Sequence, residues 1–294
     1  MSRKNIIVHN HGVLSSRLEA MMYDESVLRK LSIAVIGVDR PYYGQSDPHP
    51  LRSLTSFAAD LEASADHLLP GRRFFLAGAS GGGPYALAAA TRLHSRMRGV
   101  LLISPASHQG LLSAEEKLEW QRHNPSSLIR AFRQLSSVSG WLSRAVAALA
   151  ETPLGGRVLY DAVVKPAIDG LPSKVADVDR ACLEQRPHHM QATVPEGSRQ
   201  RTAAALFTDA ALIGAAWPFN VTADIGPELG RAVHVWQGGG DRQLPEVGSR
   251  ALSRAIPGSH LHEVPNGGHF AYFSCDLATQ RRALQALLAT ALPA

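Results

Sequence analysis

The chain has 294 residues, of which 45% are hydrophobic and 19% are charged, and its formal net charge is +5. This balance is typical of a folded globular protein and excludes an intrinsically disordered chain. The basic residues are scattered and form no run interleaved with aromatic residues, so the positive charge does not indicate a nucleic-acid-binding protein.

Short apolar runs alternate with amphipathic stretches along the first third of the chain. The apolar runs predict strands at residues 6–9, 33–38, 74–77 and 100–103. The stretches between them predict helices at residues 18–31, 54–69 and 84–93. Strands that are wholly apolar are typical of a parallel sheet with helices on both faces.

This alternation stops at residue 111 and resumes after residue 216. The segment 111–216 holds several helical patterns punctuated by prolines, and no convincing strand. Beyond it, the patterns predict strands at residues 233–236 and 261–264 and helices at 246–255 and 279–292. We therefore predict an α/β fold with a mostly parallel sheet flanked by helices. Residues 1–110 and 217–294 would form its core, and residues 111–216 a helical cap inserted over the strand ends.

One short segment, Gly78-Ala79-Ser80-Gly81-Gly82, follows a predicted strand directly and precedes a predicted helix. A serine hydroxyl is a poor nucleophile until a base removes its proton, and that base is usually a histidine oriented by a carboxylate. Functional groups of an open parallel sheet gather beyond the carboxyl ends of its strands. Asp241 and His269 each follow a later predicted strand, in loops rich in glycine.

Five landmarks in chain order carry a resemblance to a known family. They are His11-Gly12 with Ser16-Arg17, Asp39-Arg40-Pro41 with Gly44-Gln45-Ser46, the segment 78–82, Trp236-Gln237-Gly238 leading to Asp241, and Gly267-Gly268-His269. Over nearly its whole length the chain resembles the capped serine hydrolases of the α/β-hydrolase fold, whose triad has the order Ser, Asp, His.

The resemblance implies a role for each of these residues. Ser80 would be the nucleophile, His269 the general base and acid, and Asp241 the orienting carboxylate. The backbone N–H groups of Gly81 and Val13 would form the oxyanion hole. The substrate would lie beside His11 and Gly12, and Trp217 and Phe219, where the cap returns to the core, are our further candidates for substrate contacts. Small residues around Ser80 are expected, because a strained strand-to-helix turn brings neighbouring Cβ atoms against backbone.

Each assignment has a structural alternative. Ser80 could cap a helix in a glycine-rich turn, Asp241 could cap the next helix with Glu246 as the acid, and His269 could belong only to a turn. We interpret His188 and His189 as surface or packing residues and not as metal ligands. The aromatic residues Trp120, Phe132 and Trp141 are interpreted as helix packing. We expect no metal and no cofactor.

The chain departs from the family pattern in three places. Tyr42 stands where glycine is usual, and Leu14 stands where proline is usual. Ten residues precede His11, which leaves room for one strand but not for the antiparallel pair with which this fold usually begins. The strand at 33–38 would then lie at the sheet edge, and an apolar edge favours pairing with another chain. We predict a homodimer or other self-association through this edge; a compromised fold is the alternative.

The cysteines and the apolar segments bear on the compartment. Cys182 and Cys275 are far apart and in no Cys-x-x-Cys motif, which predicts neither a disulfide framework nor a zinc site and fits a reducing compartment. The segment 1–12 lacks the apolar stretch of a signal peptide. The most apolar segment, 203–217, is too short to span a membrane and contains Asp209. We expect a cytoplasmic protein without membrane contact.

The function implied by the resemblance is that of a serine hydrolase. It would cleave an ester or related acyl bond of a small to medium apolar substrate through an acyl-enzyme on Ser80. A C–C bond hydrolase and a proline-type aminopeptidase are the alternatives among enzymes, and the peptidases usually carry tryptophan where this chain has Gly81. A small-molecule receptor or a biosynthetic cyclase on the same fold is the alternative of another class. The composition, rich in arginine and alanine, suggests a bacterial source.

Overall fold

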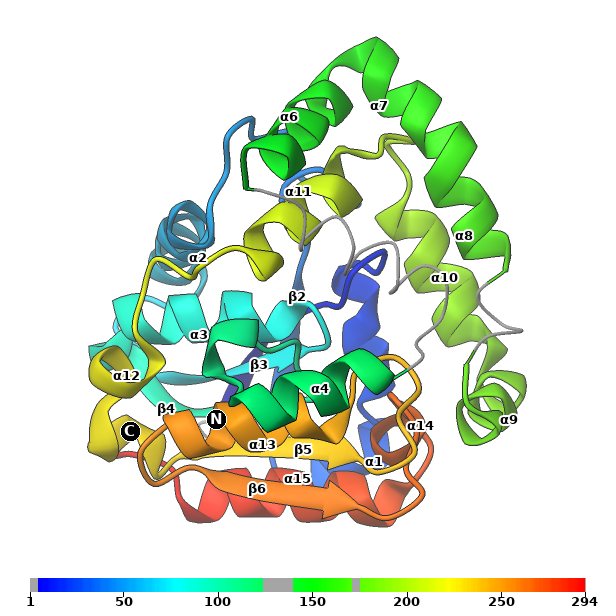
Figure 1. The fold of residues 1–294 in the computed structure, drawn as a ribbon. Helices are drawn as coiled ribbons and strands as arrows, with labels where there is room; N and C mark the ends of the chain where they lie inside the picture. The colour runs from blue at the N-terminus through cyan, green and yellow to red at the C-terminus, as the bar shows by residue number, and fades with distance from the viewer. Residues whose placement is uncertain (1–4, 124–139, 171–174, 294) are drawn as a thin grey trace.

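A computed structural model describes residues 5–123, 140–170 and 175–293 of the chain. Within these ranges six parallel strands form one sheet in the order β2-β1-β3-β4-β5-β6 (Figure 1). The strands are β1 (Asn5–Asn10), β2 (Ile33–Val38), β3 (Phe74–Ala79), β4 (Met97–Ile103), β5 (Val233–Gly238) and β6 (His260–Val264). Each strand that the apolar runs predict is confirmed, some of them extended by a few residues.

Strand β3 shows that the sheet is covered on both faces. Its side chains alternate between two hydrophobic clusters, with Phe74 and Leu76 in one and Phe75 and Ala77 in the other. All four are fully buried, because successive residues of a strand point to opposite faces and both faces carry helices.

The helices of the core fall into two layers. The first cluster includes residues of α2 (Leu54–Leu68), α3 (Gly82–Arg92), α12 (Val221–Gly230) and α13 (Glu246–Ala255). The second includes residues of the 3₁₀ helix η1 (Arg17–Met22), α1 (Glu25–Lys30), α14 (Ala271–Ser274) and α15 (Leu277–Ala289). The sheet therefore lies between two helical layers, as the α/β prediction requires.

The described part of the segment between β4 and β5 is helical and holds no strand. Besides α12, its helices are η3 (Gln109–Leu111), α4 (Ala114–Arg122), α6 (Gly140–Glu151), α7 (Pro153–Leu159), the π-helical turn η4 (Tyr160–Val164), α8 (Lys165–Asp169), α9 (Asp177–Gln185), α10 (Pro187–Gly197) and α11 (Ala204–Gly214). Figure 1 shows α6 to α10 as an arch on one side of the sheet. The boundaries of the cap, residues 111 and 216, stay a prediction.

Helix α4 differs from the arch because it lies against the core helix α13 (Figure 1). Trp120 of α4 is buried against Gly248, where a Cβ atom would collide with the indole ring. Glu116 pairs with Arg254 of α13 at 2.8 Å. The interpretation of Trp120 as a packing residue is confirmed. Phe132 lies outside the described residues, as do the side chains of Trp141, His188 and His189.

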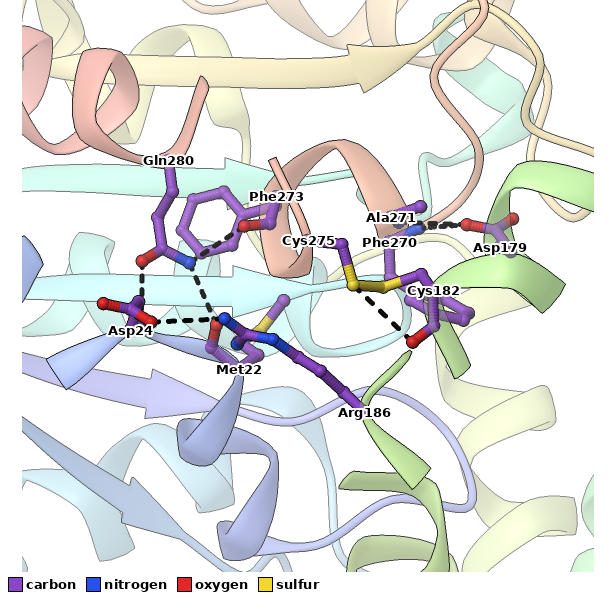
Figure 2. The surroundings of a disulfide bond; sticks show 10 residues. All are labelled: Met22, Asp24, Asp179, Cys182, Arg186, Phe270, Ala271, Phe273, Cys275 and Gln280. Carbon is purple, nitrogen blue, oxygen red and sulfur yellow. Dashed lines mark hydrogen bonds and ion pairs between the residues drawn. A yellow bond between two sulfur atoms is a disulfide. The ribbon is translucent and has the colours of Figure 1, made fainter. Parts of the chain in front are cut away.

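The two cysteines correct our prediction. Cys182 of α9 and Cys275, which follows α14, form a disulfide with their Cα atoms 5.8 Å apart (Figure 2). Their separation of 93 residues gives no pairing signal in the sequence, and only the fold brings α9 beside α14. Structural disulfides are rare in reducing compartments, so the cysteines no longer support a cytoplasmic location. Among the residues described here, no helix has the length and apolarity needed to cross a bilayer.

Strand β2 lies at the edge of the sheet, as predicted. Among the described residues, every strand pair of the sheet is parallel. One face of β2 is closely covered, because a Cβ atom at Gly37 would collide with the backbone of Arg17 in η1. Pairing of this edge with a second chain stays a prediction.

Candidate active site

Ser80 lies on the sharp turn between β3 and α3. Its φ is 51°, in the left-handed region that costs energy for any residue with a Cβ atom. The Ser80 N–H donates to the carbonyl of Ile103 in β4 at 2.9 Å, and the N–H groups of Gly83 and Ala106 donate to the Ser80 carbonyl at 3.1 and 2.9 Å. These bonds from neighbouring segments hold the strained residue in place.

Glycines on both sides of Ser80 allow this turn. A Cβ atom at Gly78 would collide with the backbone of Gly82 one turn later. A Cβ atom at Gly82 would collide with the carbonyl of Asn10 in β1. Helix α3 thus starts in backbone contact with two strands, and larger residues would push Ser80 out of position.

His269 and Asp241 meet beyond the ends of β5 and β6. The His269 Nδ1 lies 2.7 Å from the Asp241 Oδ2. The other carboxylate oxygen of Asp241 accepts hydrogen bonds from the N–H groups of Gln243 at 2.7 Å and Leu244 at 3.1 Å. The Gln237 side chain donates to Oδ2 at 3.1 Å. Asp241 therefore caps a turn and binds the histidine at once, whereas the Glu246 carboxylate pairs with Arg250.

The charges around His269 raise its pKa, as suits a general base. Burial by itself would lower the pKa of His269, but the negative charge of Asp241 and the hydrogen bond to it outweigh burial, and the pKa lies above the ordinary value of 6.5. Because Nδ1 faces Asp241, Nε2 is the ring nitrogen left to face a reacting group. The side chain keeps 15% of its surface exposed, toward the cavity that it lines.

A cavity of about 160 Å³ joins Ser80 and His269, which both line it. Its walls are mostly apolar, and the apolar residues Leu14, Leu18, Met22, Val175, Leu183 and Val194 contribute to them. The last three of these belong to the predicted cap. Polar groups at the wall include the side chains of Glu19, Arg186 and Thr193.

The predicted oxyanion residues lie next to each other. A Cβ atom built on Gly81 would lie 3.5 Å from the backbone nitrogen of Val13, and Gly12 and Val13 both line the cavity. The loop before Val13 is fixed from two sides. The Gly12 N–H donates to the Glu19 carboxylate at 3.1 Å, and the Arg40 guanidinium donates to the carbonyls of His11 and Gly12.

Of the four residues predicted to contact substrate, only Gly12 lines the cavity. Gly12 lines the cavity, whereas His11 is fully buried behind it, with Nδ1 2.7 Å from the Gly12 carbonyl. Burial and the nearby Arg40 lower the pKa of His11 well below its ordinary value, which favours its neutral form. Trp217 and Phe219 stack on each other with ring centroids 5.4 Å apart and pack against the hydrophobic core. The described residues that line the cavity do not include His11, Trp217 or Phe219.

Metal ligation has no visible candidate here. Within the described ranges, no three His, Cys, Asp or Glu side chains are grouped so that they could hold a metal ion. The absence of metal and cofactor stays a prediction.

The sequence analysis missed two buried carboxylates of the predicted cap that bind groups of the site. Asp179 of α9 accepts hydrogen bonds from the loop that carries His269. Asp209 of α11 binds Arg40 at 2.8 Å and Arg52 at 2.7 Å. Asp209 had a usable signal, since a lone carboxylate in the most apolar segment of a chain requires a buried partner. Asp179 had none, because its partners are backbone groups 90 or more residues away.

Known proteins show what this arrangement resembles. The model of the Alpha/beta hydrolase family matches residues 8–279. The chain belongs to this family. A comparison with curated proteins gave no match.

Solved structures of hydrolases share its fold. A thermophilic esterase from Thermogutta terrifontis has 20% identity and a TM-score of 0.60, with 97% of this chain and 89% of that one covered. An N-acyl homoserine lactone degrading enzyme has 20% identity and a TM-score of 0.60, with coverage of 96% and 93%. The enol-lactonase from Burkholderia xenovorans LB400 has 18% identity and a TM-score of 0.60, with coverage of 98% and 92%. At these identities the likeness shows the fold alone, and the family supports a hydrolase.

Proposed function

We propose that this α/β hydrolase is a serine hydrolase that cleaves an ester or related acyl bond through an acyl-enzyme on Ser80. One observation carries the proposal. The strained Ser80 and His269 line the same cavity, and Asp241, from a third loop, holds the His269 ring through Nδ1. A nucleophile, its base and the carboxylate that orients the base are the parts that acyl transfer requires.

The first half of the reaction forms the acyl-enzyme. His269 Nε2 takes the proton from the Ser80 hydroxyl as its oxygen attacks the carbonyl carbon, and Asp241 stabilises the resulting imidazolium. The negative charge on the carbonyl oxygen is stabilised by the N–H groups of Gly81 and Val13. When the tetrahedral intermediate collapses, the imidazolium gives its proton to the leaving group.

The second half releases the acyl group. Water loses a proton to His269 as it attacks the acyl carbonyl, and the same proton then returns to the Ser80 oxygen as the acid departs. Asp241 holds Nδ1–H throughout, so that Nε2 is the basic atom in each step.

The cavity favours a small apolar acyl group. An apolar cavity of about 150 Å³ is known to hold benzene, and the cavity beside Ser80 has about 160 Å³. The names of the structural neighbours, an esterase and two lactone-degrading enzymes, favour carboxylic esters, open or cyclic. We therefore expect short-chain aryl esters and simple lactones to be the first substrates found.

Labelling with a fluorophosphonate, followed by intact mass measurement, tests the proposal. The wild-type protein should gain one adduct, and Ser80→Ala should gain none. Ser274→Ala is the matched control, because Ser274 lines the same cavity without lying on the strained turn, and this variant should still be labelled. Turnover of an aryl ester should fall on the order of 10⁴- to 10⁶-fold in Ser80→Ala.

The opposite result has a clear meaning. A folded wild-type protein that gains no adduct would contradict the proposal. Tight binding of a small apolar ligand without turnover would then favour a receptor, or a cyclase that uses the cavity without hydrolysis.

A further inference from the structure

One face of the cap helix α9 is bound to the core at three successive points (Figure 2). Asp179 and Cys182 lie three residues apart on α9 and share one side of the helix, and Arg186 directly follows its last residue. Each of them bonds to a segment beside the candidate active site. Leu183, next to this face, lines the cavity. Helix α9 is therefore part of the site and not a distant cover.

The first point is a buried carboxylate. Asp179 is fully buried and accepts three hydrogen bonds from consecutive backbone N–H groups. The donors are His269 at 2.7 Å, Phe270 at 3.1 Å and Ala271 at 3.0 Å. Hydrogen bonds to an ionised acceptor are roughly twice as strong as neutral ones. Asp179 thus fixes the backbone of the residue whose ring is fixed by Asp241.

A glycine permits this approach. A Cβ atom at Gly268 would collide with the whole carboxylate group of Asp179. The residue that precedes His269 must therefore lack a side chain if α9 is to dock here. Gly268 and Asp179 form a matched pair across the junction of cap and core.

The second and third points hold α9 against two further segments of the core. Cys182 is bonded to Cys275, which follows the segment that Asp179 caps. Arg186, at the end of α9, pairs with Asp24 at 3.2 Å, and the Asp24 N–H donates to Gln280 at 2.7 Å (Figure 2). A carboxylate, a covalent bond and an ion pair thus fasten α9 to the core beside the loop of His269.

We propose that Asp179 is a positioning residue for His269, supplied by the cap and kept in place by the Cys182–Cys275 bond. This inference rests on the proposed function, in which His269 is the base. Asp241 sets the orientation of the ring, and Asp179 sets where its backbone stands. Displacing a reacting group by about 1 Å can cost roughly 100-fold in rate, so a residue that touches only the backbone still affects catalysis.

The charge of Asp179 gives the proposal a second consequence. The negative groups that face His269 are Asp241 in the loop after β5, Asp179 on α9 and Glu19 on η1. Arg186 lines the same cavity but is paired with Asp24. Removing one negative charge disfavours the imidazolium. A loss of Asp179 should therefore move the pH dependence of the reaction as well as its rate.

The test compares two aspartates of the same helix. Asp179→Asn keeps the shape of the side chain but turns an NH₂ group toward backbone donors, whereas Asp177→Asn changes an exposed residue in the same first turn. The rate of Ser80 labelling by a fluorophosphonate is measured from pH 5 to 9, with the thermal midpoint recorded for each variant. We expect Asp179→Asn to label about 10- to 100-fold more slowly, with a lower apparent pKa. Asp177→Asn should match wild type in both.

A second variant separates position from charge. Gly268→Ala pushes the carboxylate away but keeps its charge, so labelling should slow while the apparent pKa moves less than in Asp179→Asn. The two losses should not add in the double variant, because both break one contact. If Asp179→Asn cannot be purified as a folded protein, Gly268→Ala still tests the same contact.

The role of the disulfide is tested by measuring the effect of Asp179→Asn with and without it. In a Cys182→Ala/Cys275→Ala protein, α9 keeps two of these three attachments, those of Asp179 and Arg186. Asp179→Asn should therefore lower the labelling rate more in that protein than in the disulfide-bonded one. Equal costs would show that the disulfide does not keep Asp179 in place.

The outcomes separate this inference from the proposed function. A wild-type protein that does not label would overturn the proposed function itself. If wild type labels but Asp179→Asn labels at the same rate with the same apparent pKa, only the role of Asp179 is overturned. A slower rate with an unchanged pKa in both Asp179→Asn and Asp177→Asn would show a general loss of structure, and would also overturn it.

Discussion

The predicted cap reaches the candidate active site through two helices that use a buried carboxylate in different ways. On α9, Asp179 binds neutral backbone groups of the His269 loop, and a disulfide lies one turn away. On α11, Asp209 binds the guanidinium groups of Arg40 and Arg52, and Arg40 in turn binds the carbonyls before Val13. The cap is thus joined to the base on one side and to the predicted oxyanion loop on the other.

The two junctions differ in how they depend on charge. Asp209, Arg40 and Arg52 are fully buried, and the hydroxyls of Tyr43 and Tyr85 donate to the carboxylate at 2.7 and 2.6 Å. Burial would raise the pKa of Asp209, but the two guanidinium groups outweigh it and lower the pKa. Removing Asp209 would leave two buried cations unpaired, whereas removing Asp179 leaves only backbone donors. The α11 junction should therefore matter more for stability and the α9 junction more for the reaction.

The largest effect should come from the carboxylate that holds the ring of His269. Asp241→Asn should lower turnover by roughly 10⁴-fold, because the amide favours the wrong histidine tautomer. The loss is far larger than the one expected for Asp179→Asn, which acts through the backbone. Steady-state turnover of an aryl ester by both variants gives the ranking, and equal losses would erase the distinction between ring and backbone.

Breaking the contacts of Asp209 on α11 with Arg40 and Arg52 should cause the largest single loss of stability. Asp209→Asn should lower the free energy of unfolding by about 3–5 kcal/mol, since it leaves buried charge uncompensated. The matched control is Asp169→Asn, which removes an exposed pair with Lys165 on the cap helix α8 and should cost less than about 1 kcal/mol. Denaturant unfolding of both variants decides the matter, and similar costs would mean that the buried network contributes little.

Breaking the covalent part of the α9 junction should cost less. The bond closes a loop of 93 residues, and removing a disulfide typically lowers stability by about 2–4 kcal/mol. Unfolding of a Cys182→Ala/Cys275→Ala protein in denaturant measures this directly. A loss as large as that of Asp209→Asn would show that α9, and not α11, is the stronger attachment of the cap.

The pH dependence should be the mildest effect. The pKa of His269 is raised, and the base must be neutral, so the rate should increase with pH through a value above 6.5. The change is at most about tenfold per pH unit. A profile of kcat/KM from pH 5 to 9 checks it, and a rate that is flat across this range would contradict the role of His269 if chemistry limits the rate.

Much of the core was visible in the sequence because its signals are local. Short runs rich in apolar residues predicted all six strands, and the glycines around Ser80 predicted a tight turn, since both depend on residues adjacent in the chain. The loops holding Asp241 and His269 followed from their position after predicted strands. Parallel strands bring their carboxyl ends to one edge, so the order of elements was enough to place these residues together.

The cap was decided by tertiary structure. Nothing local marks Cys182 as the partner of Cys275, or Asp179 as the acceptor for the N–H of His269, since each pair spans about 90 residues. Trp217 and Phe219 were expected at the cavity but stack on the core instead. The sequence by itself determined the sheet and the loops that meet at its edge, because period and turn chemistry act over a few residues. Only the packing of helices decided which cap residues reach those loops, because that depends on how long segments fold back on each other.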